Sequence, residues 1–85
     1  MKNLEPIVKL LDGIIDDRTI PRNIRAAAEE AKKEISEKPD NSWDIRLSSA
    51  ISILDEIIND PNMPMYARTQ IWNIVSMLEA VKREL

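Results

Sequence analysis

Hydrophobic residues recur along the chain at intervals of three and four positions, which places them on one face of a helix rather than on alternate positions of a strand. Four such stripes can be traced: Leu4, Ile7, Val8, Leu11, Ile14 and Ile15; Ile20, Ile24, Ala27, Ala28, Ala31 and Ile35; Leu47, Ala50, Ile51, Leu54, Ile57 and Ile58; and Ala67, Ile71, Ile74, Val75, Leu78, Val81 and Leu85. The pattern predicts an all-α fold with helices over residues 4–17, 20–37, 43–59 and 63–84.

The residues at the start of each stripe support these boundaries. Pro6, Pro21 and Pro64 fall in predicted first turns, where a missing backbone N–H costs nothing. Short polar residues that can accept a hydrogen bond from a first-turn N–H precede each helix, namely Asn3, Thr19, Asn41 or Ser42, and Asn62. On helix 20–37 the small side chains of the alanine stripe also predict close packing against a neighbouring helix.

The chain also repeats itself. A shift of 43 positions aligns residues 11–25 with residues 54–68 and gives seven identities in those fifteen positions. Two units of one helical hairpin each, about 1–42 and 44–85, are therefore expected. Because a hairpin cannot bury its apolar face alone, the economical arrangement is a single domain, residues 1–85, in which both hairpins pack as a four-helix bundle.

Composition removes several classes of function. The chain of 85 residues contains no Cys and no His, which excludes disulfides, soft-metal ligation and relays that depend on a thiol or an imidazole. No uncharged run is long enough to span a membrane, and the N-terminal residues lack an uninterrupted apolar segment, so we expect a cytoplasmic protein. Neither a cofactor nor a resident metal ion is predicted.

The run Leu11-Asp12-x-Ile14-Ile15-x-Asp17, followed by Pro21 and Arg25 and echoed from Leu54 to Arg68, resembles uncharacterised protein family 0147 of archaea. The resemblance covers nearly the whole chain. It implies a small cytoplasmic helical protein of unassigned function, and it supplies no catalytic residues.

Two matched pairs of charged residues are predicted to be structural. Asp12 and Arg25 lie at similar distances from the first interhelical turn, and Asp55 and Arg68 repeat them in the second hairpin. We interpret each pair as an ion pair across its antiparallel hairpin, which would fix the register of the two helices. The alternative is an acid and a cation that act together on a phosphate.

Three further patterns allow functional alternatives. The acids Asp16, Asp17 and Asp60 could hold a weakly bound Mg²⁺ or Ca²⁺, or could organise the turns through hydrogen bonds to the backbone. Glu29, Glu30 and Glu34 are reminiscent of magnesium-dependent nucleotide hydrolases, although no second acidic box follows. Basic residues at Arg22, Arg25, Lys32 and Lys33, and at Lys82 and Arg83, leave a ribonucleoprotein-associated nucleic-acid binder as an alternative. The formal net charge of −3 and the interleaved acids argue against it, because they would repel a phosphate backbone.

The fourth helix carries the best functional signal. Met65 and Trp72 lie off its core stripe with Tyr66 on the flank, whereas the aligned positions of the first repeat are Arg22, Glu29 and Asn23. Trp, Tyr and Met are enriched at protein interfaces. We therefore predict a non-enzymatic interaction or scaffold module of unknown process, which forms a homodimer through this helix or binds another protein there. In the structural alternative, part of the same chain covers Trp72.

Overall fold

The computed structural model describes residues 4–36 and 43–85, and all of its regular structure is helical. The four helices are α1 (Glu5–Ile15), α2 (Arg22–Ser36), α3 (Trp43–Ile57) and α4 (Met65–Arg83). Each helix lies within its predicted range. Most of the helix termini lie one or two residues inside the predicted limits. The all-α prediction is thus confirmed for the described residues.

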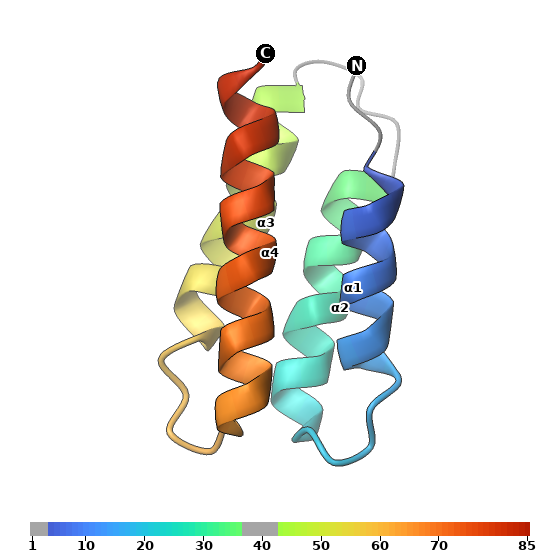
Figure 1. Ribbon diagram of the computed structural model, residues 1–85, viewed down its shortest axis with the longest axis vertical. Helices are drawn as coiled ribbons and strands as arrows, with labels where there is room; N and C mark the ends of the chain where they lie inside the picture. Colours follow the sequence, from blue (N-terminus) through green and yellow to red (C-terminus); the bar gives the residue numbers. More distant parts are fainter. Residues whose placement is uncertain (1–3, 37–42) are drawn as a thin grey trace.

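The helices run antiparallel to their neighbours around a common axis (Figure 1). α1 packs against α2, α2 against α3, α3 against α4, and α4 returns to α1, while α2 and α3 form the most extensive of these contacts. The molecule measures 35 × 19 × 19 Å. The start of α1 and the end of α4 lie at one end, and the connections 16–21 and 58–64 lie together at the other end (Figure 1). We call this second end the connection end.

Apolar side chains from all four helices fill the centre. Leu11, Ile24, Leu54 and Ile71 are fully buried, and every buried side chain among the described residues is apolar. Ala28 and Ala31 of α2 are also fully buried. Their small volume lets the backbone of α2 approach its neighbours, which agrees with the extensive packing of α2 on α3. Trp43 packs partly buried against the same core, as the first residue of α3.

The helix starts differ from the predicted capping pattern. α4 has Pro64 at its N-cap, with no hydrogen bond from a capping side chain, and α1 has Leu4 there, also without one. Thr19 and Asn62 instead donate their backbone N–H groups to the carboxylates of Asp17 and Asp60, at 2.9 and 2.8 Å. The cap positions expected at Asn3, Asn41 and Ser42 lie outside the described residues.

Candidate functional site

The two connections are tied to each other by side chains at the connection end. The Tyr66 hydroxyl, in the first turn of α4, donates to Asp17 Oδ2 at 3.2 Å and is hydrogen-bonded to the Thr19 hydroxyl. Asn23, in the first turn of α2, donates from Nδ2 to Asp60 Oδ2 at 2.5 Å. Each connection therefore accepts a hydrogen bond from the helix start of the other hairpin. We call these side chains the cross-hairpin clasp.

The clasp follows the internal alignment of the sequence. A shift of 43 positions takes Asp17 to Asp60 and Asn23 to Tyr66, so one bond is the counterpart of the other. The backbone of the connections corresponds in the same way, because Ile20 N–H bonds Asp17 O at 3.1 Å and Met63 N–H bonds Asp60 O at 3.2 Å. The turn interpretation is confirmed for Asp17 and Asp60, because each carboxylate accepts a backbone N–H within its own connection.

The Asp17 carboxylate is held in its charged form. Hydrogen bonds from the Thr19 hydroxyl and backbone N–H lower the pKa of Asp17 below its ordinary value and outweigh the opposing desolvation. The Tyr66 hydroxyl and the charge of Arg25 lower it further. In residues 4–36 and 43–85, no group of three or more acids is placed to hold a metal ion.

The two predicted ion pairs are wrong. Arg25 Nε donates to the carbonyl oxygen of Ile20 at 3.0 Å. The guanidinium of Arg68 donates to the carbonyl oxygens of Ile58 and, at 3.1 Å, of Asp60. Both arginines thus hold the backbone of the connection that precedes their own helix. Carbonyl groups in such turns and at helix ends lack regular backbone partners, and a long cationic side chain can satisfy them.

The acids of these pairs are placed elsewhere. Lys32 Nζ donates a hydrogen bond of 2.6 Å to Asp12 Oδ1 and so links α2 to α1. This hydrogen bond raises the pKa of Lys32. Asp55 is exposed, and its carboxylate pairs with no cation among the described residues. The hairpin α1–α2 is therefore bridged by Asp12 and Lys32 in place of Asp12 and Arg25.

Several charged residues that could have bound a phosphate or a metal ion instead interact with other groups of the chain. Arg25 and Lys32 of the basic set are engaged as described, and Lys82 Nζ lies 3.9 Å from Asp44 Oδ1. Glu34 accepts from Arg46 at 2.7 Å, which bridges α2 and α3. These interactions reduce the number of charged groups that remain for a phosphate or a metal ion.

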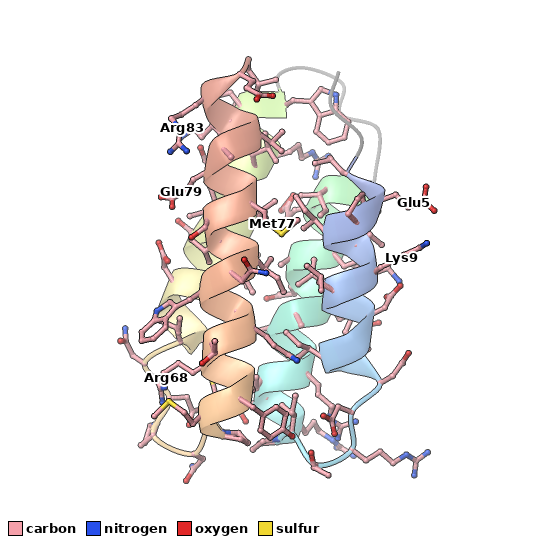
Figure 2. The ribbon with its side chains drawn as sticks, in the orientation of Figure 1. Glu5, Lys9, Arg68, Met77, Glu79 and Arg83 are labelled. Carbon is pink, nitrogen blue, oxygen red and sulfur yellow. The ribbon has the colours of Figure 1, made fainter. Side chains whose placement is uncertain are left out.

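The predicted interface residues are exposed on α4. The exposed fractions are 72% for Met65, 56% for Trp72 and 46% for Tyr66, and no described segment covers Trp72. Helical spacing places Met65 and Trp72 on the face that carries Arg68 and Glu79. Figure 2 shows Arg68, Glu79 and Arg83 on the outer side of α4, whereas Met77 points toward the space between α4 and α1.

Sequence reasoning assigned Tyr66 to the interface alone and missed its place in the clasp. The signal was available, because Tyr66 aligns with Asn23 and both side chains can donate a hydrogen bond. It also missed Ile45 and Ile53, which with Ile57 form a second apolar stripe on α3, and it assigned Ile57 to the core stripe alone. Ile45 is 55% exposed, so this stripe reaches the surface.

Among the described helices, none has the length and apolar character needed to cross a membrane. The model of the uncharacterised protein family UPF0147 matches residues 1–81. A UPF0147 protein of Methanocaldococcus jannaschii is 56% identical over 79 residues, which cover 93% of this chain and 84% of the relative.

Two solved structures have the same fold. A crystal structure from Thermoplasma acidophilum, of a protein of the same uncharacterised family, superposes with a TM-score of 0.85 at 39% identity and covers 91% of this chain and 89% of the other. The crystal structure of protein MMP1188, of unknown function, gives a TM-score of 0.84 at 49% identity, with 89% and 85% covered.

Proposed function

The chain belongs to the uncharacterised archaeal family UPF0147, and within that family we propose that it acts as a non-enzymatic protein-interaction module of the cytoplasm that dimerises through α4. The observation that carries this proposal is the exposure of Met65 and Trp72 on the outer face of α4. Tyr66 borders this face, with its hydroxyl in the clasp and nearly half of its surface exposed.

The proposed architecture is a four-helix bundle of two repeated hairpins. The reciprocal bonds of the clasp, Tyr66 with Asp17 and Asn23 with Asp60, support an approximate two-fold relation between the halves. Under this relation α4 corresponds to α2, whose aligned residues at Met65 and Trp72 are Arg22 and Glu29. The bundle therefore does not require apolar residues at these two positions, and a partner surface accounts for them.

The size of the apolar side chains indicates what dimerisation could contribute. A fully covered aromatic side chain removes about 150–250 Å² from water. Because Trp72 is 56% exposed, covering this exposed part would remove roughly 100 Å² per chain from water. At about 25 cal/mol per Å², that burial contributes ~2.5 kcal/mol per chain. In a symmetric dimer each chain offers the same face, so Trp72 would lie near its own copy or near Met65 of the partner.

Sedimentation velocity at several protein concentrations tests this proposal. The wild-type chain should dimerise, and the double variant Trp72→Glu, Met65→Arg should remain a folded monomer because both positions lie outside the core. The matched control is Leu10→Glu, Ile45→Arg, which places the same charges at two other exposed apolar positions and should still dimerise.

Helicity and thermal unfolding by circular dichroism establish that each variant is folded. A wild-type chain that stays monomeric at every concentration would refute dimerisation, and a control variant that dissociates equally would place the interface elsewhere. A double variant that unfolds would show that Trp72 belongs to the core.

A further inference from the structure

A groove lies between α2 and α3 at the connection end, with a volume of about 400 Å³. We call it the α2–α3 groove. Its floor is apolar and its rim acidic: the floor consists of Ala27, Ile53 and Ile57, and the rim of Glu30, Glu56 and Asp60. Ile53 and Ile57 are only partly buried against the core, so the floor can be reached from outside.

The charge around this groove is one-sided. No basic side chain lines it, and neither Glu30 nor Glu56 forms an ion pair with a described residue. Two adjoining depressions share Ile53 and continue along α3. The three together are lined by five carboxylates and two cations, a net charge of −3 that equals that of the whole chain.

The bridge between Glu34 and Arg46, at 2.7 Å, neutralises the next part of this face toward the start of α3. The α2–α3 groove proper therefore keeps its acids without compensating cations. Such a rim repels phosphate groups and attracts ammonium and guanidinium groups.

The internal alignment shows that the fold does not impose this arrangement. A shift of 43 positions takes the rim residues Glu30 and Glu56 to Asn73 and Gly13, which lie on α4 and α1. The corresponding side of the molecule is thus uncharged at both positions. Because Glu30 and Glu56 are both exposed, core packing does not explain them.

We propose that the α2–α3 groove binds a cationic amphipathic helix of a partner protein. Ile53 and Ile57 lie one helical turn apart, about 6 Å along α3, which matches the spacing of apolar anchors on a docked helix. The partner's aliphatic side chains occupy the floor, and Lys or Arg side chains on either flank pair with Glu30 on α2 and Glu56 on α3. This surface is distinct from the α4 face and does not depend on dimerisation.

The probe for this proposal is a fluorescein-labelled helical peptide about four turns long, with Ile along one face and Lys on both flanks. Its binding to the full chain is measured by fluorescence anisotropy. Glu30→Gln, Glu56→Gln should weaken binding about tenfold, since two charge pairs at the rim of an interface are lost. The matched control, Glu29→Gln, Glu79→Gln, removes the same charge from exposed positions outside the groove and should bind as the wild type does.

A second peptide, with Glu in place of each Lys, should not bind, and a third, with Ser in place of each Ile, should bind about tenfold more weakly or not at all. Methyl spectra of the wild-type chain locate the site, because the Ile53 and Ile57 signals should shift on addition of the first peptide while Ile14, the counterpart of Ile57, should not.

The proposal is overturned if the first peptide does not bind, or if rim and control variants lose affinity equally, since general charge attraction would then suffice. Shifts confined to other isoleucines would also overturn it. A rim variant that dissociates a dimer in sedimentation would assign the groove to a second copy of this chain.

Discussion

Replacing Arg68 by Met tests the role that the structure gives to the matched arginines. The variant keeps an apolar stem and removes the donors to the carbonyl oxygens of Ile58 and Asp60. A hydrogen bond from a charged group contributes about 1.5–3 kcal/mol when buried and less when water reaches it. Because these bonds are partly buried, we expect a total loss of about 2 kcal/mol in the free energy of unfolding.

The matched variant in the first hairpin is Arg25→Met. Arg25 holds a single carbonyl, that of Ile20, at 3.0 Å. Its loss should therefore be about half as large, ~1 kcal/mol. Urea unfolding followed by circular dichroism measures both values, and for a chain of this size each kcal/mol also lowers Tm by about 4–8 °C.

The acid partners expected from the sequence provide the decisive comparison. An ion pair between Asp55 and Arg68 would make Asp55→Asn costly and would couple the two substitutions. In the structure the carboxylate of Asp55 is exposed, so Asp55→Asn should change stability by less than about 0.5 kcal/mol. The double-mutant cycle of Asp55→Asn with Arg68→Met should give a coupling energy near zero. A coupling above about 1 kcal/mol, or a smaller loss for Arg68→Met than for Arg25→Met, would refute this reasoning.

Two further variants test local features of the structure. Gly13 lies within α1, and a Cβ there would meet no atom within 4 Å. Gly13→Ala should therefore raise the free energy of unfolding in urea by about 0.5–1 kcal/mol. The reverse change, Ala26→Gly at an exposed position of α2, should lower it by a similar amount. Asp17 has a lowered pKa in the folded chain, so its contribution to stability is full above about pH 4 and is lost as the pH falls through the folded value. Asp17→Asn should therefore flatten the acid limb of Tm against pH, and an equal flattening by Asp16→Asn at the neighbouring exposed position would contradict this assignment.

The helices and the core could be predicted because they depend on a period that the sequence displays directly. Residues such as Leu11, Ile24 and Leu54 recur at helical spacing and are fully buried. The first and third helices end earlier than predicted, at Ile15 and Ile57. The reason is local, since Asp17 and Asp60 each accept a backbone N–H two residues later and thereby stabilise a turn instead of a further helical turn.

The actual partners of Asp12 and Arg25 could not be predicted from their mirrored positions alone. That argument placed Asp12 and Arg25 at the same height along the hairpin, but it compared only two side chains. It left out the carbonyl groups exposed by the connection, which the arginine can reach, and Lys32 on α2, which reaches Asp12 at 2.6 Å. A pattern of charges indicates which residues lie near each other, whereas the partner depends on side-chain reach and on unsatisfied backbone groups.

Under the proposed repeat, the positions at which the two hairpins agree and differ separate structural from functional residues. Asp17 and Asp60 agree, and each organises a connection and accepts a bond from the other hairpin. The donors of the two clasp bonds differ in residue type. Tyr66 aligns with Asn23, and each donates a hydrogen bond to an aspartate of the other hairpin. This difference preserves the bond while changing the surface, because a phenol ring adds apolar area to α4 that an amide does not.

The other differences have no such structural equivalent. Trp72 stands opposite Glu29, and Glu30 opposite Asn73, and in each case both residues are exposed and both hairpins pack without their help. An apolar face has arisen on α4 and an acidic one on α2, each where the other hairpin lacks it. Because these four side chains are exposed, burial in the core does not account for the asymmetry. An apolar surface on α4 and an acidic surface between α2 and α3 would allow one small chain to hold its own copy and a cationic partner at the same time.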